Sequence, residues 1–385
     1  MKLLVFNAGS SSLKYRGFEV PSGGVPVERT GVRGVVERIG EGGGAADHAA
    51  AVGQALRALP PSEQTEFDAF AHRVVHGGDR FAAPVLIDDE TLDAIERATA
   101  RAPLHNGPAL AVIGECRRTT RPATPQVAVF DTAFHRTLPD RARFYALPFD
   151  LARRHGVRRF GFHGLSYRSM LDGYARATGR SVEGSRLVAF HLGNGASACA
   201  MRDGRSVDTS MGFTPLEGLV MGTRCGDLDP ALVPFLAERE RVPCEEVVEL
   251  LNERSGLLGL SGVSRDVREV ERAAEDGNRD AGLALEIFAY RARKYLGAYV
   301  AALGGADAVL FGGGIGEHVT SVRAAILERL DELGISLDRE RNDRVREGLG
   351  RISADGSRIE AWVVPTDEEA VIAQDAAALL DRAES

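Results

Sequence analysis

A short pattern of residues occurs near the N-terminus and again in the middle of the chain, and it limits the folds that the chain can adopt. The first copy is Leu4-Val-Phe-Asn-Ala-Gly-Ser-Ser-Ser-Leu-Lys14, and the second is Val188-Ala-Phe-His-Leu-Gly-Asn-Gly-Ala-Ser-Ala198. Each copy predicts a buried strand, a polar residue, a glycine turn and a second strand. The second copy continues into Asp203-Gly204, which is a hairpin-turn signal. Two such hairpins predict two similar domains that face one cleft.

Elsewhere, short β-rich apolar runs alternate with helical periodicity, which predicts an α/β fold. The apolar runs predict buried strands at residues 3–6, 70–75, 127–130, 187–192, 309–311 and 361–364. Apolar residues spaced three and four apart predict helices at residues 92–100, 108–117, 166–178, 266–274, 280–303, 319–333 and 368–380. The low-complexity stretch 40–46 predicts a surface loop.

Composition excludes several classes of protein. The 385 residues carry a net charge of −8, so the chain lacks the global positive field that attracts nucleic acid. Its length exceeds what one conventional core needs and favours two domains. The apolar run at residues 3–6 is too short for a signal peptide or a membrane span, so we expect a cytoplasmic protein without a membrane partner. The four Cys show no C-x-x-C spacing, which predicts reduced thiols without a zinc site.

Three glycine-rich turns follow predicted strands, at residues 7–12, 191–197 and 312–317. Glycine lets backbone N–H groups approach a phosphate closely, and the hydroxyls of Ser10 and Ser12 add donors. Any one of these turns could serve only to make a tight hairpin. Three in one chain favour a bound nucleotide.

The common nucleotide motifs do not fit these turns. The segment 9–14 lacks the Gly that precedes Lys in a P-loop, and a strand follows it. The segment 193–198 has the letters of a dinucleotide motif, but that motif must open a helix, and a hairpin follows here. The third turn does precede a helix, expected to begin near Val319, whose N-terminal N–H groups suit a phosphate or adenosine group.

Nine ordered motifs resemble those of the acetate kinase family, from residue 1 to about residue 380. The motifs lie at residues 7–14, 72–78, 103–106, 130–135, 161–166, 191–195, 221–227, 314–317 and 365–369. The resemblance implies the fold shared with actin, hexokinase and Hsp70, in which two duplicated RNase H-like domains flank a nucleotide cleft. It also implies a homodimer. We expect the first domain to comprise residues 1–140 with the C-terminal helix 370–385, and the second residues 141–369.

The implied reaction is reversible, direct in-line transfer of the γ-phosphoryl group of ATP to acetate, which gives acetyl phosphate and ADP. A carboxylate with a pKa of roughly 4 to 5 is ionised at neutral pH, so no general base is needed. The site must instead hold anions together, a task for Arg, His and Mg²⁺, with Mn²⁺ as an alternative. By resemblance, Arg73 pairs with the substrate carboxylate or the phosphoryl group, and Arg224 and His163 stabilise the transition-state oxygens.

The resemblance also assigns metal and catalytic carboxylates. Asp131 ends a predicted buried strand and matches a catalytic position. Because the nucleophile arrives ionised, we expect Asp131 to orient Mg²⁺ or a water molecule. Asn7 and Glu368 match magnesium-associated positions. Glu369 is an alternative to Glu368, and we expect whichever of the two does not face the metal to cap the final helix or face solvent.

Further positions resemble substrate contacts of the family. An apolar acyl pocket is implied at Val75, Leu104, Phe162 and Pro215. Nucleotide contacts are implied at Ser10, Ser12, Lys14, His191, Leu192, Gly193, Asn194, Gly195, Asp266, Val267, Arg268, Gly314, Ile315, Gly316, Glu317 and His318. One methylene in an apolar pocket changes specificity by only about 1 to 3 kcal/mol, so a propionate or butyrate kinase remains an alternative. A non-catalytic, actin-type nucleotide-binding module is another.

The chain departs from the family pattern at a few positions, which are Ala8, Leu165-Ser166-Tyr167, Cys225 and His318. Tyr167 and Cys225 flank positions matched to catalytic residues. His318 replaces an amide beside the expected adenine or ribose and bears on nucleotide preference. No departure removes a charged group that the reaction needs.

Overall fold

The computed structural model describes residues 1–21, 23–61, 63, 67–99, 103–121 and 124–384. The chain divides into two compact units. Unit 1 comprises Met1–Arg136, Phe162–Leu165 and Asp367–Ser385, and unit 2 comprises Thr137–Gly161 and Ser166–Thr366. No helix in the described part of the chain is both long enough and apolar enough to cross a membrane.

Unit 1 contains a six-stranded mixed sheet with the strand order β3-β2-β1-β4-β6-β5. Its strands are β1 (Lys2–Ala8), β2 (Ser12–Glu19), β3 (Val27–Glu37), β4 (Ala69–Val74), β5 (Val85–Leu86) and β6 (Gln126–Phe130). The central strands β1, β4 and β6 run parallel, so their carboxyl ends meet at one edge of the sheet.

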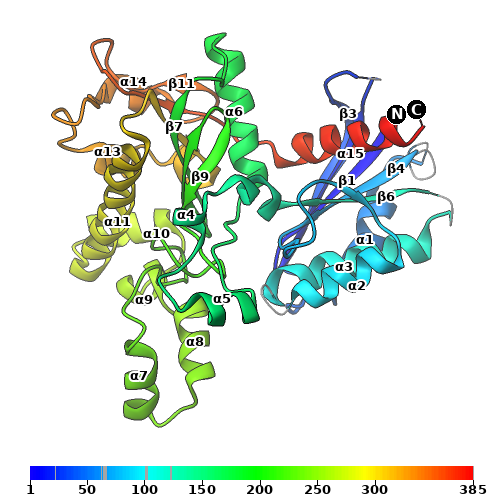
Figure 1. The fold of residues 1–385 in the computed structure, drawn as a ribbon, viewed down its shortest axis with the longest axis horizontal. Coiled ribbons are helices and arrows are strands. Elements are labelled where there is room, and N and C mark those ends of the chain that lie inside the picture. The colour runs from blue at the N-terminus through cyan, green and yellow to red at the C-terminus, as the bar shows by residue number, and fades with distance from the viewer. Residues whose placement is uncertain (22, 62, 64–66, 100–102, 122–123, 385) are drawn as a thin grey trace. The chain divides into compact units, whose positions relative to one another are not determined.

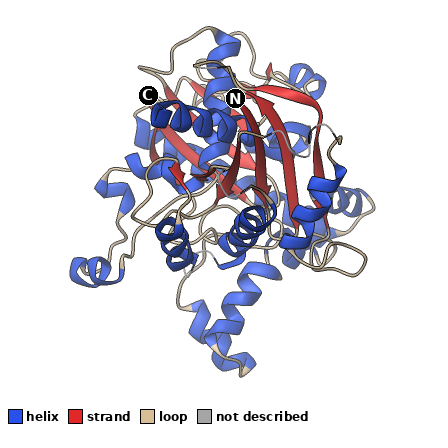
Figure 2. Ribbon diagram, turned by 90° about the vertical axis from the view of Figure 1, so that its right-hand side faces the viewer, coloured by secondary structure: helices blue, strands red, loops and turns tan. Residues whose placement is uncertain are grey.

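Helices cover both faces of this sheet (Figures 1 and 2). They are α1 (His48–Ala58), α2 (Asp89–Ala98), α3 (Pro103–Thr119), the 3₁₀ helix η2 (Asp131–Thr137) and α15 (Glu368–Glu384). Successive strand residues point to opposite faces. Leu3 and Val5 pack with Ile372 of α15, whereas Leu4 and Phe6 pack on the α1 and α3 side. A central strand therefore buries both faces, which explains the continuous apolar runs in the sequence.

Unit 2 contains a second six-stranded sheet, in the order β11-β12-β10-β7-β8-β9. Its strands are β7 (Arg186–Leu192), β8 (Ala196–Arg202), β9 (Arg205–Thr209), β10 (Ala308–Gly312), β11 (Gly350–Arg351) and β12 (Glu360–Val363). The hairpin between β8 and β9 turns at Asp203 and Gly204, both of which have positive φ, as the sequence predicts.

The remaining helices belong to unit 2, except that the first two residues of α6 lie in unit 1. They are α4 (Asp140–Arg143), α5 (Phe149–His155), α6 (Gly164–Thr178), α7 (Leu232–Glu240), α8 (Cys244–Glu253), α9 (Gly256–Ser261), α10 (Val267–Glu275), α11 (Arg279–Leu303), α12 (Gly313–His318), α13 (Thr320–Leu327) and α14 (Arg339–Arg344).

The two sheets have the same pairing pattern. In each, an antiparallel three-stranded meander is followed by two parallel strands and a short antiparallel edge strand. The strand β1 corresponds to β7, β4 to β10, and β6 to β12. The expected duplicated α/β fold is confirmed.

The third glycine turn is the main correction to the predicted elements. The sequence predicts a turn at 312–317 and a helix over 319–333, but α12 already begins at Gly313. A second helix, α13, runs from Thr320 and ends at Leu327. The carboxylate of Glu317 accepts a hydrogen bond from Gly313 N at 3.0 Å, which compensates a free N–H group at the start of α12. The side chain of Glu317 thus stabilises the N-terminus of α12, although the glycines in this segment disfavour a helix.

Candidate active site

Three polar residues of unit 1 lie at the carboxyl ends of its parallel strands. Asn7 is near the end of β1, Arg73 is near the end of β4, and Asp131 follows β6. The register pairs Phe6 with His72, so Asn7 and Arg73 come next on neighbouring strands. Their side chains point to the face that α15 covers, because Leu3 and Val5 of the same alternation pack on that helix.

Arg73 connects the three strand ends. Its Nη2 donates to Asp131 Oδ2 at 2.5 Å, and its Nη1 donates to Asn7 Oδ1 at 3.3 Å. Its Nε is buried and has no hydrogen-bond partner among the described residues. Burial alone would lower the pKa of Arg73, but Asp131 and Glu368 more than offset this effect and raise it. The guanidinium therefore stays charged, and its Nε lies 3.8 Å from Glu368 Oε2, beyond hydrogen-bond distance.

Asp131 is fully buried, and its second oxygen, Oδ1, makes no hydrogen bond to a described residue. Burial raises the pKa of Asp131, the charge of Arg73 opposes this, and the charge of Glu368 adds to it. A buried carboxylate oxygen without a partner is costly, and a hydrogen-bond donor or a cation would relieve that cost.

The first turn of α15 contributes two further carboxylates. Asn7 Nδ2 donates to Glu368 Oε2 at 3.0 Å and to Glu369 Oε1 at 2.7 Å. Glu369 is only 9% exposed, and its Oε2 lies 3.7 Å from Arg16 Nη1. The expectation that one of the two glutamates caps the helix or faces solvent is wrong. Asp367 caps the helix instead, by accepting from Ala370 N at 3.0 Å.

The charges of this cluster fit a divalent cation. Asp131, Asp367, Glu368 and Glu369 are joined through hydrogen bonds and ion pairs to Arg16 and Arg73. Among the described residues no three His, Cys, Asp or Glu are arranged to hold a metal ion. Mg²⁺ typically takes one or two protein carboxylates and keeps several waters or phosphate oxygens. The cluster therefore suits a partly hydrated Mg²⁺ ion and does not suit a metal held by protein ligands alone.

His163 lies in the segment of unit 1 that precedes α6. Its φ is 59°, in the left-handed region that residues with a side chain rarely adopt. The next residue is Gly164, where a Cβ would lie 2.0 Å from Asp131 O and 2.6 Å from Phe134 Cβ. The close packing of Gly164 on Asp131 fixes the strained backbone of His163 within this cluster.

The expected acyl-pocket residues fall on both units. Val75 and Phe162 are buried in unit 1, where Phe162 O bonds to His135 Nε2 at 2.9 Å. Pro215 belongs to unit 2, and its carbonyl accepts from Arg224 Nη1 at 3.1 Å. Burial lowers the pKa of Arg224. The side chain of Leu104 lies outside the described part of the chain.

Most of the expected nucleotide contacts lie in unit 2. Residues 191–195 form the turn between β7 and β8, which Gly193 N closes by donating to Gly195 O at 3.0 Å. Gly222 packs on this turn, since a Cβ there would lie 2.2 Å from Asn194 Oδ1. Asp266 is the N-cap of α10 and accepts from Arg268 Nε at 3.0 Å. Val267 is buried beside them.

The segment from Gly314 to His318 forms α12, as described above. Its Glu317 is engaged within unit 2, because Oε1 also accepts from Thr366 N and Thr366 Oγ1, both at 3.0 Å. His318 is exposed, and its Nδ1 bonds to Arg346 O at 2.7 Å. Ile315 and Gly316 are buried, whereas Gly314 is exposed. The backbone of Gly314 and the ring of His318 are therefore the accessible parts of this segment.

Ser10, Ser12 and Lys14 belong to unit 1, apart from the other expected nucleotide contacts. Lys14 pairs with Asn7 in the β1–β2 register and its side chain is exposed. Arg16 lies two residues further along β2, on the same face as Lys14. Arg16 Nη1 donates to Asp367 at 2.6 Å. Sequence reasoning missed Arg16, although this period of two was a signal for it.

The departures from the family pattern are accommodated. Tyr167 is buried, and its hydroxyl bonds to Ser197 Oγ at 2.5 Å. Cys225 Sγ donates to Gly226 O at 3.1 Å, and burial raises the pKa of its thiol to about 11. All four cysteines are free thiols, as predicted.

These observations define a class of protein, a duplicated α/β fold with a carboxylate–arginine cluster in one unit and glycine-lined turns in the other. The profile of the acetokinase family matches residues 2–374, and the chain belongs to this family. The resemblance drawn from the motifs is thereby confirmed.

Individual relatives agree over nearly the whole chain. The chain is 45% identical over 404 aligned positions to the acetate kinase of Halothermothrix orenii, covering 99% of this chain and 100% of that one. The crystal structure of Porphyromonas gingivalis acetate kinase superposes with a TM-score of 0.89 at 39% identity, covering 98% of this chain and 99% of the other. A propionate kinase from Francisella tularensis superposes with a TM-score of 0.86 at 35% identity, covering 97% and 98%.

Proposed function

We propose that this protein catalyses reversible transfer of the γ-phosphoryl group of ATP to acetate, which gives acetyl phosphate and ADP. Its full-length similarity to acetate kinases supports this activity. The observation that carries the proposal is the buried pair of Arg73 and Asp131. Neither Arg73 Nε nor Asp131 Oδ1 makes a hydrogen bond to a described residue, and Arg73 Nε lies 3.8 Å from Glu368 Oε2. Arg73 Nε suits an anion, and Asp131 Oδ1 suits a cation or a water molecule bound to the cation.

In the proposed step an ionised acetate oxygen forms a bond to the γ-phosphorus while the bond to the ADP oxygen breaks in line with it. Arg73 would donate through Nε to the acetate or the phosphoryl group. His163 and Arg224 would donate to the phosphoryl oxygens, which carry the charge of the transition state. No residue has to remove a proton from the nucleophile.

The metal ion that we propose is Mg²⁺, with Mn²⁺ as a substitute. When bound, it would neutralise charge on the phosphate oxygens of ATP. Asn7 and Glu368 would hold it, and Asp131 Oδ1 would orient the ion or one of its waters. Because Asn7 Oδ1 accepts from Arg73, that hydrogen bond would be exchanged when the metal binds.

For the nucleotide we propose the glycine turn at residues 191–195, the start of α10 and the α12 segment in unit 2. Backbone N–H groups at helix starts and glycine turns suit phosphates. Lys14, with Ser10 and Ser12, would supply donors from unit 1.

The decisive experiment is an activity matrix of acetate, propionate and butyrate against several nucleotides with Mg²⁺, with the acyl phosphate trapped by hydroxylamine. We expect acyl hydroxamate to form most efficiently with acetate and ATP. A tenfold preference for propionate or butyrate would identify the alternative enzyme, which the similarity to a propionate kinase brings into consideration. Binding of ATP without hydroxamate would identify a nucleotide-binding module.

We further propose a cytoplasmic homodimer with folding domains at residues 1–140 with 370–385 and at residues 141–369. The homodimer rests on the similarity to the acetokinase family. Light scattering on the purified protein would give the oligomeric mass, and a monomer would contradict the homodimer.

A further inference from the structure

A partly buried polar network in unit 2 holds the loop that ends in Pro215. Its three side chains are Tyr145, which follows α4, Arg159, which precedes the segment with His163, and Glu217. Glu217 accepts a short hydrogen bond from the Tyr145 hydroxyl, and its Oε1 accepts from Arg159 Nη2 at 2.5 Å. Side chains from three separate stretches of sequence thus meet in one group.

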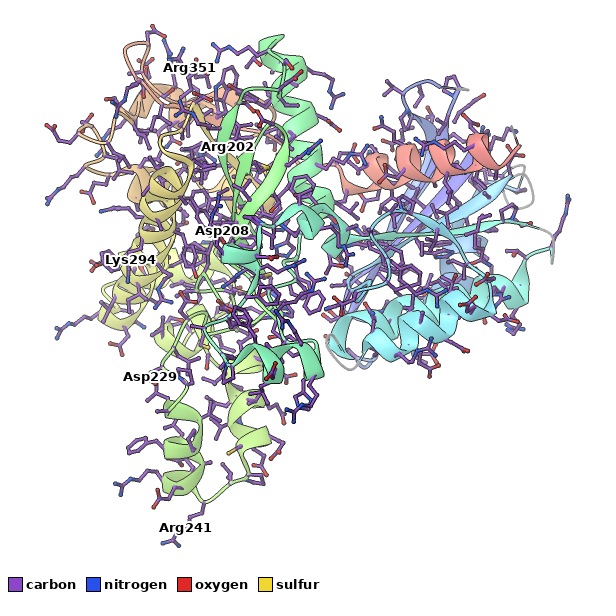
Figure 3. All side chains as sticks on the ribbon, viewed as in Figure 1. Arg202, Asp208, Asp229, Arg241, Lys294 and Arg351 are labelled. Carbon is purple, nitrogen blue, oxygen red and sulfur yellow. The ribbon has the colours of Figure 1, made fainter. Side chains whose placement is uncertain are left out.

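Arg159 and Tyr145 bond to the backbone between Thr209 and Phe213. Arg159 Nη1 lies 3.0 Å from Thr209 O and 3.1 Å from both Ser210 O and Met211 O. Phe213 N donates to the Tyr145 hydroxyl at 2.8 Å. Asp208, labelled in Figure 3, lies in the strand β9 that leads into this stretch.

Gly212 shows how closely the backbone packs on the network. A Cβ at this position would lie 1.8 Å from Glu217 Oε2 and 2.1 Å from the Tyr145 hydroxyl oxygen. The carbonyl of Gly212 accepts from Phe160 N at 3.0 Å. The network therefore fixes Gly212 and, through it, the Phe160–Gly161 stretch that continues into Phe162 and His163.

The same loop contacts the arginine proposed for catalysis. Two residues after Phe213, the carbonyl of Pro215 accepts from Arg224 Nη1 at 3.1 Å. Burial raises the pKa of Tyr145, so its hydroxyl remains a donor to Glu217 at neutral pH. Glu217 keeps Arg159 charged, and the guanidinium can bond several carbonyls at once, as its planar fork allows.

We infer that Tyr145, Arg159 and Glu217 form a positioning network that sets Pro215 and the guanidinium of Arg224 for the reaction. These side chains act through the loop and are not catalytic residues. The inference rests on the proposed function, because it concerns the acyl pocket and phosphoryl contacts of that reaction. A misplacement of about 1 Å in such contacts can cost about 100-fold in rate.

The test is Tyr145→Phe, which removes only the hydroxyl that joins Phe213 N to Glu217. We expect kcat to fall about 10- to 100-fold and KM for acetate to rise several-fold, with KM for ATP unchanged. Hydrogen exchange at Phe213 N should accelerate. A merely structural defect would lower the fraction of active enzyme and leave both KM values unchanged.

Tyr174→Phe is the matched control, because Tyr174 is buried in unit 2 and its hydroxyl accepts from Arg180 Nη1 at 3.3 Å, outside the network. It should keep wild-type kinetics. Arg159→Lys keeps the positive charge opposite Glu217 but loses the planar guanidinium that bonds several carbonyls. We therefore expect it to change kcat and KM for acetate as Tyr145→Phe does. If the wild-type protein is active and Tyr145→Phe leaves KM for acetate unchanged, this inference is overturned and the proposed function stands. Wild-type protein inactive on every acid would overturn the proposed function and this role with it.

Discussion

A pair of stacked rings lies at corresponding positions in the sheets of the two units, but the ring types differ. In unit 1, Phe6 stacks on His72, with ring centroids 5.8 Å apart. In unit 2, Phe190 stacks on Phe311, with centroids 5.5 Å apart. The register pairs the partners in each case across the two central parallel strands. A duplicated scaffold has therefore kept its packing while one of its rings became titratable.

The next residues on these strands differ more. Asn7 and Arg73 follow the ring pair in unit 1, whereas His191 and Gly312 follow it in unit 2. In unit 1 these two strands thus end in polar side chains, the amide of Asn7 and the charged guanidinium of Arg73. Unit 2 ends β10 at Gly312, where a Cβ would lie 2.5 Å from Met170 Sδ. In the function proposed above, the first copy of the scaffold binds the metal and the small anion, and the second binds the nucleotide through its backbone.

The largest expected effect tests whether unit 2 contributes only backbone. Arg224→Ala should lower kcat by about 100- to 1000-fold, the range seen when one donor to a transition-state oxyanion is lost. KM for acetate should change much less. Steady-state kinetics against Arg205→Ala, an exposed arginine of β9, would measure this. Unchanged turnover in Arg224→Ala would contradict the role proposed for Arg224 in the transition state and would leave unit 2 only the role of binding the nucleotide.

A smaller effect tests the charged cluster of unit 1. Asp131→Asn should raise the Mg²⁺ concentration needed for half-maximal activity by about 10- to 100-fold, as loss of a residue that orients a metal site does. Acetate binding should remain. Asp89→Asn is a suitable control, since Asp89 pairs with Arg117 at 2.8 Å but is exposed. A loss of acetate affinity without a change in metal dependence would contradict the role given to Asp131.

The last test measures stability rather than catalysis and concerns the ring pair itself. Burial lowers the pKa of His72 from 6.5 to about 4, while its hydrogen bond to Gln126 opposes the shift. The unfolded chain then binds more protons between these values, so the folded state loses about 3 kcal/mol as pH falls from 6.5 to 4. The contribution is fully present above pH 6.5.

The variant His72→Phe gives unit 1 the ring pair of unit 2 and should remove this part of the pH dependence. Denaturant unfolding at pH 7, 5.5 and 4.5 would compare the slopes of the unfolding free energy. Only these slopes are compared, because the variant also loses the 2.8 Å hydrogen bond between His72 and Gln126, which changes its free energy of unfolding at every pH. Equal slopes in the variant and the wild type would show that His72 does not titrate in this range.

The sequence was sufficient to predict the central strands and the hairpins. A strand covered on both faces must be apolar throughout, as in β6, and the Asp203-Gly204 turn requires residues that tolerate positive φ. The strand β3 was missed because it is largely exposed and shows no strict alternation. The start of α12 was missed because the stabilising group is the side chain of Glu317 rather than a residue before the helix.

In the site, the motifs located Asn7, Arg73, Asp131 and Glu368, and the structure brings these four together in unit 1. Which of Glu368 and Glu369 faces the metal stays a prediction, but the expectation that the other caps α15 or faces solvent was wrong. Adjacent helix residues normally point in different directions, but Asn7 meets the first turn of α15 and donates to both. Such a contact depends on tertiary packing, which no local pattern encodes.

The place of α15 in unit 1 has a consequence for synthesis of the protein. Leu3, Val5 and Ala71 are buried against this helix, which consists of residues 368–384. When residues 1–136 have left the ribosome, one face of their sheet still lacks its cover, and it stays uncovered until residues 368–384 have been translated. Unit 2, whose residues all precede α15, can complete its own core earlier. Unit 1 is therefore expected to mature after unit 2, and a nascent chain stalled before residue 368 would expose an apolar sheet face.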